Sequence, residues 1–439
     1  MLIRSPLDRA RDPIAPTKPP LDRDTLRDVI DLALWAGQML LVSGAQSARV
    51  ERTVHQIGTS LGADWLDVVV QPESLIVTTT SGGEFRTRVR RVVHTGVDLA
   101  RVAALSTLAK RVIAGEVDRA AVRAELERLD ALRHSYPRAL VVVMIGLGCA
   151  AFSRLFGGDW TTFAVTFMAA ALAMWVRQTL ARAHFNPLLG VIVTAFVAGV
   201  IPGAAAWVGL LPHPETALAA SALLLVPGVP LINAARDILR GHIVTGTARG
   251  ISGIVLSLCI ALGLLLALRV TGVDGLGPIV QPARDLVTML AIDGLWSGVA
   301  ALAFAVLFNV PRRLLAYCAM TAAAGHALRA GLLLTGIPLT AATLFGAILI
   351  GVASEVLARR LKTPAGVFSV PAAIPMIPGV FAFRAMIGVI ALTNTPPTAD
   401  TLVLMETVHN FAVTGLVLAT LAAGIALPSL IVHRPRPVV

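Results

Sequence analysis

Long apolar segments dominate the chain from Pro137 onward, and polar residues gather mainly in the short stretches between them. Most segments hold about 20 residues or more, the length that an α-helix needs to cross the hydrocarbon core of a bilayer. We predict ten membrane-spanning helices, with approximate limits 137–156, 160–181, 188–211, 215–239, 248–270, 286–310, 313–334, 338–358, 366–391 and 402–428. The pattern therefore predicts a mainly α-helical, polytopic membrane protein.

The first 133 residues carry shorter patterns. Residues 1–23 combine five prolines with mixed charge, which predicts a disordered tail. Helical spacing of apolar residues predicts one helix from Asp24 and a second that ends near Gly62, Asp98 is suited to cap a helix to about Ala114, and a charged helix follows at 117–132. Alternating patterns predict strands at 65–70, 74–80 and 85–93. We therefore expect residues 24–133 to form a small soluble α+β domain.

Three arginines share one face of the last predicted strand. Arg86, Arg88 and Arg90 alternate there with Phe85, Thr87 and Val89. We expect the arginine row to be a solvated outer face. Contact with anionic lipid headgroups, or with the protein's own membrane part, is the alternative.

Two apolar segments carry the same interruption near their middle. Val226-Pro227-Gly228-Val229 lies in the fourth predicted span, and Ile377-Pro378-Gly379-Val380 lies in the ninth. A proline removes a backbone donor and clashes with the preceding turn, and glycine weakens the helix further, so each pair should break its helix. Paired interruptions of this kind at matching places in two halves of a membrane protein point to a transporter's substrate site.

The distribution of arginine and lysine predicts the orientation. With the N-terminus inside, one set of loops and ends carries Arg177, Arg182, Arg236, Arg240, Arg249, Arg312, Arg313, Arg359, Arg360, Lys362, Arg434 and Arg436, and the other carries Arg154, Arg269, Arg284 and Arg329. Because cytoplasmic loops hold the excess of bases, both termini should be cytoplasmic. Ten spans then divide into two sets of five, residues 137–285 and 286–430, that cross the membrane in opposite senses as an inverted repeat.

Composition argues against several other classes of protein. The chain is 56% apolar and only 14% charged, and most of its net charge of +11 belongs to the membrane part, so nucleic-acid binding is not expected. Cys149, Cys259 and Cys318 lie in apolar segments without close spacing, which predicts neither a disulfide nor a metal site. We expect no cofactor and no cleavable signal peptide.

The stretch Ser43-Gly44-Ala45-Gln46-Ser47-Ala48-Arg49-Val50-Glu51-Arg52-Thr53 resembles the signature of the threonine/serine exporter family. Arg91-Val92 and Gly96-Val97-Asp98-Leu99 also resemble it, as does a soluble domain followed by ten spans in two sets. The resemblance covers roughly residues 24–430, with Gln46 and Ser47 standing where the family pattern has Glu and Thr. It implies export of L-threonine and L-serine driven by the proton motive force, and in some relatives the two parts occur as separate proteins.

A small amino acid brings a carboxylate and an ammonium, and a membrane site must satisfy both. The residues Pro227, Gly228, Pro378 and Gly379 should expose backbone N–H groups at new helix starts that can receive the carboxylate. Asn233 and Arg384 each stand six residues after the proline, and Arg384 could clamp the carboxylate in a bidentate manner. Alternatively, the Arg384 side chain extends toward the outer surface of the membrane.

The ammonium and a coupled proton need acids or neutral acceptors inside the spans. We single out Asp293, Glu406 and His409, of which Glu406 and His409 share a helix face with Asn410. Hydration of Glu406 at the outer interface is the alternative. An i,i+4 pair of Glu355 with Arg359 is expected at the cytoplasmic edge, and His326 and Arg329 share a face of the seventh span.

In the soluble domain the motif residues are Ser43, Gly44, Arg49 and Glu51. They fit a helix cap with an exposed ion pair, and a ligand sensor or a gate against the membrane part is the alternative. Ser47, His55 and His94 would permit a hydrolase, but the sequence has no nucleophile elbow, zinc-protease helix or phosphate loop. We therefore predict no enzyme activity.

The membrane pattern, the paired breaks and the family resemblance together predict a secondary active transporter of the cytoplasmic membrane. The resemblance implies that it exports threonine, serine or similar small amino acids, coupled to the proton motive force. Its partners would be a small amino acid, protons and the lipid bilayer, and homo-oligomerisation is left open. The competing hypothesis is a membrane receptor or enzyme whose N-terminal soluble domain binds or hydrolyses a small ligand.

Overall fold

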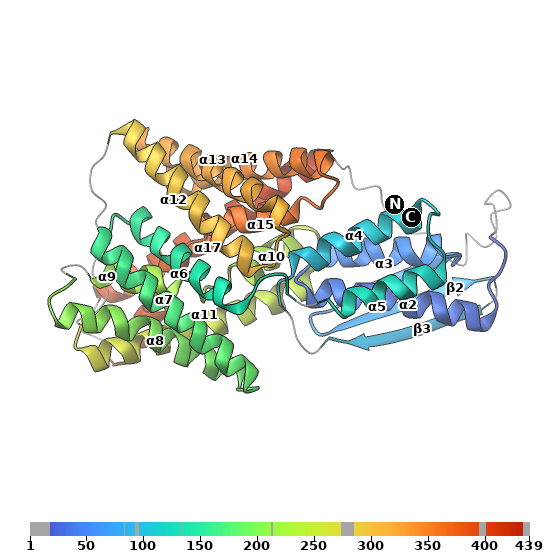
Figure 1. Ribbon diagram of the computed structural model, residues 1–439, viewed down its shortest axis with the longest axis horizontal. Coiled ribbons are helices and arrows are strands. Elements are labelled where there is room, and N and C mark those ends of the chain that lie inside the picture. Colours follow the sequence, from blue (N-terminus) through green and yellow to red (C-terminus); the bar gives the residue numbers. More distant parts are fainter. Residues whose placement is uncertain are drawn as a thin grey trace. The chain divides into compact units, whose positions relative to one another are not determined.

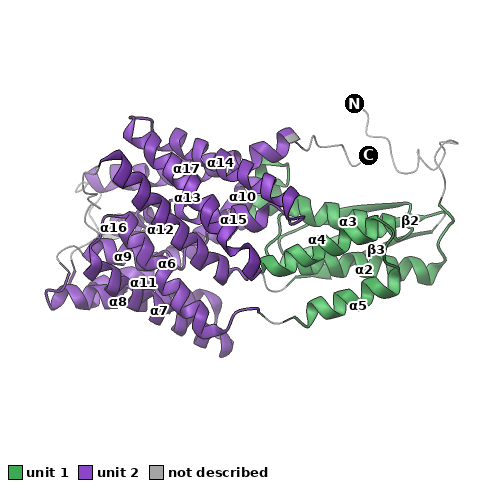
Figure 2. Cartoon of the chain, turned by 45° about the horizontal axis from the view of Figure 1, so that its top comes forward, with its two compact units in different colours: residues 1–134, 237–248 green, residues 135–236, 249–439 purple. Residues whose placement is uncertain are grey.

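The computed structural model describes residues 18–82, 84–92, 96–132, 134–211, 214–273, 285–394 and 401–432. The chain divides into two compact units, coloured separately in Figure 2. Unit 1 holds residues 1–134 together with 237–248, and unit 2 holds residues 135–236 and 249–439. The segment 237–248 thus clusters with the soluble domain. It includes the last three residues of the predicted span 215–239 and the first residue of the predicted span 248–270, so those limits extended too far.

Over its described residues up to 134, unit 1 joins four helices to a three-stranded antiparallel sheet (Figure 1). The helices are α2 (Arg23–Val42), α3 (Ser47–Ser60), α4 (Leu99–Ile113) and α5 (Arg119–Asp130), and the strands, in the order β1-β2-β3, are β1 (Trp65–Val70), β2 (Ser74–Ser81) and β3 (Glu84–Arg91). The Asp98 carboxylate accepts a hydrogen bond from the Arg101 N–H and caps α4 as predicted. The α+β character of this region is confirmed.

The end of the predicted disordered tail packs on unit 1. Lys18 Nζ donates to the Thr59 carbonyl at 2.6 Å, and the Leu21 N–H donates to Ser81 Oγ at 2.8 Å. Residues 1–17 lie outside the described part of the chain.

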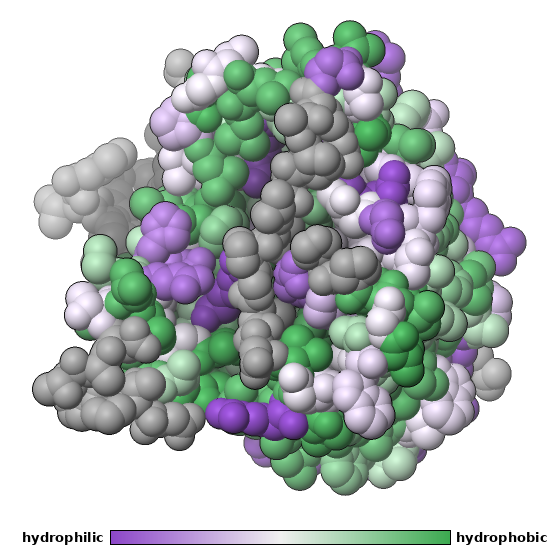
Figure 3. Space-filling model, turned by 90° about the vertical axis from the view of Figure 1, so that its left-hand side faces the viewer, coloured by the Kyte–Doolittle hydropathy of each residue, from purple (hydrophilic) through white to green (hydrophobic). Residues whose placement is uncertain are grey.

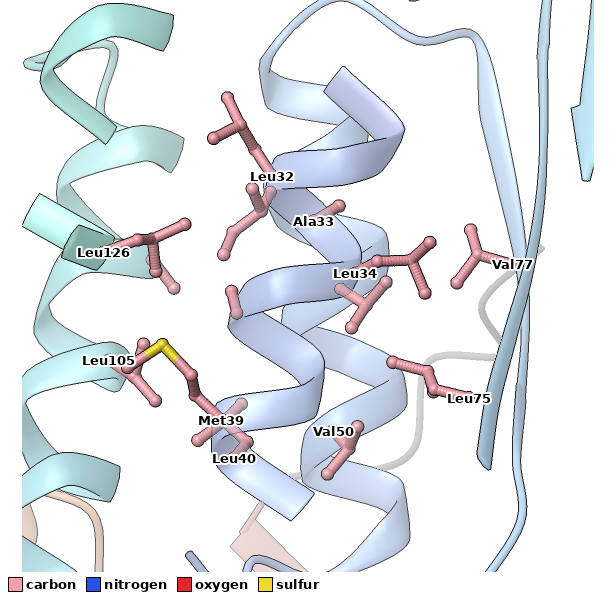
Figure 4. Packing of buried hydrophobic residues seen from close by; sticks show 14 of the residues in the cluster. Leu32, Ala33, Leu34, Met39, Leu40, Val50, Leu75, Val77, Leu105 and Leu126 are labelled. Carbon is pink, nitrogen blue, oxygen red and sulfur yellow. The ribbon is translucent and has the colours of Figure 1, made fainter. Parts of the chain in front are cut away.

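Helix α2 is the centre of the core of unit 1. Figure 4 shows Leu34 on the side of Leu75 and Val77 of β2, and Met39 on the side of Leu105 of α4. Because the helix has neighbours on opposite sides, it buries more than the one apolar face that its spacing predicts. A helix that is apolar on several sides is a buried one.

The arginine row of β3 faces the opposite way from the prediction. The register pairs Arg90 with Leu75 and Arg88 with Val77, so these arginines lie on the helix-covered face of the sheet. Phe85 and Val89 are 72% and 63% exposed on the other face. The prediction of a solvated outer face was therefore wrong: the strand register turns the row toward the helices, where Arg88 pairs with Asp31 of α2 at 2.9 Å.

Unit 2 consists of helices, apart from connecting turns, in the part that the structure describes. In chain order they are α6 (Arg138–Leu155), α7 (Trp160–Arg182), α8 (Pro187–Trp207), α9 (Pro214–Ala222), α10 (Gly228–Leu239), α11 (Ile243–Thr271), α12 (Leu286–Leu307), η1 (Arg312–Leu314), α13 (Leu315–Leu334), α14 (Leu339–Arg360), α15 (Gly366–Ala373), η2 (Ile374–Met376), α16 (Gly379–Asn394) and α17 (Thr401–Val432). Helix α10 begins in unit 2 and ends in unit 1, and α11 does the reverse.

Seven of these helices are long and apolar enough to cross a membrane, counted over the described residues. The pair α15/η2 and α16 adds an eighth if it forms one span bent by 54°. Two predicted spans fall outside this count: 215–239 is divided between α9 and α10, and α13 carries Tyr317, His326 and Arg329, which lower its mean hydropathy. The protein is a multi-pass membrane protein, and ten crossings stay a prediction.

Large apolar side chains of unit 2 lie on its surface. Trp207 is 86% exposed, Leu402 77% and Val287 75%. Hydrophobic residues make up much of the face in Figure 3, with hydrophilic residues in separate patches. Between the helices small residues meet instead: a Cβ on Gly424 would lie 2.6 Å from that of Ala347. This is the packing expected of helices surrounded by lipid.

Candidate functional site

The two Pro-Gly breaks have the same backbone structure. The Gly228 N–H donates to the Val226 carbonyl at 2.7 Å, and the Gly379 N–H donates to the Ile377 carbonyl at 2.8 Å. Each proline is thus the middle residue of a tight three-residue turn. A new helix starts at once, because Leu231 N–H and Ala382 N–H reach the carbonyls of Pro227 and Pro378, both at 3.0 Å.

The two breaks also touch one another. A Cβ placed on Gly228 would overlap the side chain of Ile377, and a Cβ placed on Gly379 would lie 2.9 Å from that of Val226. Each glycine therefore packs against the residue that precedes the other break's proline. Only glycine permits so close an approach, and Pro227, Gly228, Pro378 and Gly379 consequently lie at a single crossing in unit 2.

Asn233 and Arg384 occupy equivalent positions on the helices that leave this crossing. Asn233 is 4% exposed on α10. Arg384 is half-buried on α16, and the carboxylates that act on its charge belong to Glu406 of α17 and Glu215 of α9. Both residues already make polar interactions within the protein. Arg384 thus has acidic residues near it, which is a different setting from an arginine that extends alone to the surface.

Beside the second break, an acid and a histidine meet in the interior of unit 2. Asp293 Oδ2 of α12 lies 3.8 Å from His326 Nδ1 of α13, and the two side chains are 11% and 12% exposed. Arg329, one turn further on α13, carries the charge that faces Asp293, and the backbone of Pro375 in η2 lies beside the imidazole. Asp293 was predicted from the sequence to be a proton site, whereas His326 and Arg329 were predicted only to share a helix face.

Glu406 and His409 lie on the exposed side of α17. Asn410, expected on the same face, is only 4% exposed. The three residues therefore do not share one environment. Asp293 is buried, whereas Glu406 is open to the surroundings of unit 2 and contributes through its charge near Arg384.

In unit 1 the two stretches of the motif lie together. Gly44 ends α2 with a φ of 79°, and a Cβ there would lie 2.7 Å from the Gly96 carbonyl oxygen. The Gly96 N–H donates to the Val42 carbonyl at 2.7 Å, and the Asp98 N–H donates to the Ser43 carbonyl at 3.2 Å. Glycine is required at position 44 both for its positive φ and for this approach.

Helix α3 begins against a carboxylate that is far away in sequence. The Ser47 N–H donates to Asp237 Oδ1 at 3.1 Å, and Ser47 Oγ donates to Asp237 Oδ2 at 3.0 Å. Both residues are 0% exposed and belong to unit 1. Glu51 lies 3.4 Å from His242 Nε2. Asp237 and His242 were missed, although Asp237 is the single acid between Glu215 and Asp274.

The residues that would permit a hydrolase have other partners. Ser47 is held by Asp237, and His55 Nδ1 is bonded to the Leu66 carbonyl at 2.9 Å. His94 lies outside the described residues. Arg49 is half-buried and makes polar interactions of its own. Across the described ranges, no group of three histidines, cysteines or acids could hold a metal ion.

The fold and the site define a class: a multi-pass membrane protein in which two broken helices meet, joined to a small α+β domain. The chain belongs to the threonine/serine exporter family. The family model ThrE, a threonine/serine exporter, matches residues 31–271, and a second exporter model, ThrE_2, matches residues 293–431.

Curated relatives divide into short and long chains. A protein of Escherichia coli, named a probable succinate transporter subunit, is 36% identical over 253 residues, which are 57% of this chain and 97% of its own length. A probable threonine/serine exporter of Mycobacterium tuberculosis is 24% identical over 84% of this chain and 71% of its own. An uncharacterised protein of Haemophilus influenzae is 24% identical over 95% of this chain and all of its own. No solved structure matches.

Proposed function

We propose that the protein is a secondary active transporter that exports threonine, serine or a similar small amino acid across the cytoplasmic membrane, driven by the proton motive force. The observation that carries this proposal is the reciprocal contact of the two breaks, in which Gly228 packs on Ile377 and Gly379 packs on Val226. Two interrupted helices that meet are the arrangement in which transporters bind substrate with backbone groups.

The substrate carboxylate would lie at the helix starts that follow the breaks. The Gly228 and Gly379 N–H groups are used in the two tight turns, and the Leu231 and Ala382 N–H groups bond to the proline carbonyls. Because Pro230 has no N–H, the binding amides would be that of Val229 at the first break and those of Val380 and Phe381 at the second. Arg384 would add a bidentate donor pair, with Glu406 and Glu215 balancing its charge between substrates. Asn233 would bind the ammonium or hydroxyl through its amide oxygen.

The coupled proton would be carried by Asp293 and His326. They are close enough to share a proton after a small movement, and they stand beside the second break, where Pro375 lies next to the imidazole. Proton transfer there can therefore act on the broken helix directly. Glu406 and His409 are the second set of proton candidates, and their exposure supports a role at the entrance rather than at the centre.

The proposed topology has ten crossings in two inverted sets of five, residues 137–285 and 286–430, with both termini cytoplasmic. The matching turns at the breaks and the two family models, which meet between residues 271 and 293, support this division. Single cysteines placed at Glu215 and Asn394 of a cysteine-free variant should label from outside, and cysteines at Gly241 and Lys362 should label only from inside. Labelling of all four from one side contradicts the inverted arrangement.

Succinate is a second candidate substrate, favoured by the name of the Escherichia coli relative. A dicarboxylate has no ammonium, so it would use Arg384 and the helix starts without needing Asn233. The word subunit in the same name supports assembly with a second chain or a second copy.

Transport by purified protein in liposomes tests the proposal. Liposomes with an imposed pH gradient would be loaded in parallel with labelled threonine, serine or succinate. We expect gradient-dependent movement of an amino acid that stops when an ionophore collapses the gradient. If only succinate moves, succinate replaces the amino acid as the proposed substrate. If none of the three compounds moves, the proposed function is wrong.

A further inference from the structure

A cleft of about 280 Å³ lies in unit 1 where α2, β3 and α5 come together. Its walls carry Asp31 and Trp35 of α2, Arg88 and Arg90 of β3, and Arg123 of α5. The two strand arginines reach it because the register turns their face of β3 toward the helices. The cleft is thus formed within unit 1, and three guanidinium groups share it.

Two of the three guanidinium groups already have a carboxylate partner. Arg88 Nη1 lies 2.9 Å from Asp31 Oδ1, and Arg123 pairs with Asp28. Arg90 is half-buried and, among the residues that the structure describes, takes part in no ion pair and no side-chain hydrogen bond. Three positive charges against two negative ones leave a surplus of one, and Arg90 carries the unused donors.

The surplus charge and the lining of the cleft define what it can bind. A guanidinium group is always charged, and its planar fork matches a carboxylate in a bidentate manner. A singly charged anion balances the surplus, whereas a second negative charge would be repelled by Asp28 and Asp31. Leu32 and Trp35 line the same cleft and offer an apolar surface to the rest of the ligand. A pocket of about 300 Å³ is at the small end of the usual range, so the ligand is compact.

We propose that unit 1 binds a small organic monocarboxylate in this cleft. The Arg90 guanidinium receives the carboxylate, Arg88 and Arg123 add positive charge around it, and the apolar part of the ligand lies against Trp35. The inference does not depend on transport, because every residue that it uses belongs to unit 1 and none belongs to the Pro-Gly breaks. It gives unit 1 a ligand of its own and assigns a role to the arginine row of β3.

Titration calorimetry of the full-length protein in detergent tests the site, with benzoate as the probe. Benzoate should bind to the wild type, and Arg90→Gln should weaken that binding about ten- to hundredfold, because a charged hydrogen-bond partner is lost. Benzamide has the same shape without the charge and should bind to the wild type no better than benzoate binds to Arg90→Gln. Arg86→Gln is the matched control, since Arg86 shares the face of β3 but is not among the lining residues. Equal benzoate affinity in the wild type and Arg90→Gln, or no binding at millimolar benzoate, would overturn the proposal.

Hydrogen exchange of the same protein locates the bound probe. Benzoate should slow amide exchange in residues 31–35 and 88–90 of the wild type and have no effect there in Arg90→Gln. If the slowing is confined to unit 2, the carboxylate binds elsewhere and the proposal is wrong. Arg90→Lys keeps the charge without the fork and should bind benzoate with intermediate affinity, which tests the site even if Arg90→Gln folds poorly.

A charge variant tests the selection of a singly charged ligand. Asp31→Asn raises the surplus to two positive charges, so inorganic phosphate should bind to this variant about threefold or more tighter than to the wild type. The melting temperature shows whether the variant is folded. Equal phosphate binding would mean that the cleft does not select by charge, and the assignment to a monocarboxylate would be wrong.

Discussion

The two units use apolar residues in opposite ways. In unit 1 the large apolar side chains are inside: Leu34, Leu40 and Leu105 are at most 2% exposed. In unit 2 many face outward, and beside buried large side chains such as Phe368 the interior holds many alanines and glycines and polar residues such as Asp293 and Asn233. Burial of apolar surface drives the folding of the first, whereas close approach of small residues and matched polar groups specifies the second. A substitution should therefore have different consequences in the two units.

The largest effect is expected at the breaks. Replacing Pro227 and Pro378 together by alanine restores two backbone donors and removes two ring clashes, so the helices can continue. The glycines are kept, because a Cβ at either would overlap its neighbour. We expect transport to fall about a hundredfold or more, equivalent to about 2.7 kcal/mol. Pro202→Ala, inside α8, is the control. Wild-type flux in the double variant would show that the breaks serve packing alone.

A buried leucine of unit 1 should matter far more than an exposed leucine of unit 2. Leu40 is fully buried, and Leu40→Ala should destabilise unit 1 by about 2–5 kcal/mol. Leu402 is 77% exposed on α17, and Leu402→Ala should change stability by less than about 0.5 kcal/mol. Thermal unfolding in detergent measures both. Equal losses would mean that the surface of unit 2 is packed against something else.

Arg384 and Asn233 test whether the two breaks contribute equally. Arg384→Lys replaces a planar pair of donors by a single ammonium, which should weaken substrate binding about ten- to hundredfold, or about 1.5–3 kcal/mol. Asn233→Ala should cost less unless its amide touches the substrate. Equilibrium binding of labelled substrate to detergent-solubilised protein provides the comparison, and a larger loss for Asn233→Ala would reverse the assignment of the carboxylate.

Two glycines of unit 1 with positive φ allow the effect of backbone strain to be separated from the effect of steric overlap with an added Cβ. Gly44 has a φ of 79° and a neighbouring carbonyl 2.7 Å from its missing Cβ, whereas Gly115 has a φ of 71° and open space around it. Gly44→Ala should cost about 2–3 kcal/mol and Gly115→Ala about 1 kcal/mol. The melting temperatures of the two variants measure the difference, and similar values would mean that the motif turn relaxes.

The smallest effect is expected for the stability of unit 1 at low pH. Hydrogen bonds from the Thr25 N–H and hydroxyl hold the pKa of Asp22 below its ordinary value of 3.8. Because the folded pKa is the lower one, this stabilisation is present above the unfolded pKa and is lost as the pH falls through the folded pKa, below about 4. Asp22→Asn should make the melting temperature of unit 1 less dependent on pH in that range. If Asp22→Asn leaves the dependence of the melting temperature on pH unchanged in that range, Asp22 does not contribute this stabilisation.

Local patterns were sufficient for most elements. The strands predicted at 65–70, 74–80 and 85–93 correspond to β1, β2 and β3 with ends shifted by at most two residues, because period-two alternation is a local signal. The break at Pro227 was also foreseen, since proline acts on its own helix. The side of the sheet on which Arg88 lies was not predicted. It depends on which face the helices cover and on Asp31, more than 50 residues earlier in the chain.

The sequence by itself indicated most helices and strands, the two places where helices break and the long apolar segments suited to a membrane, because these depend on neighbouring residues and on hydrophobicity. The tertiary structure alone decided that Gly228 meets Ile377, that Asp293 meets His326, and that Asp237 caps a helix 190 residues away. Such contacts are set by the packing of whole elements, in which a partner's distance along the chain carries no signal, and the candidate site is built from them.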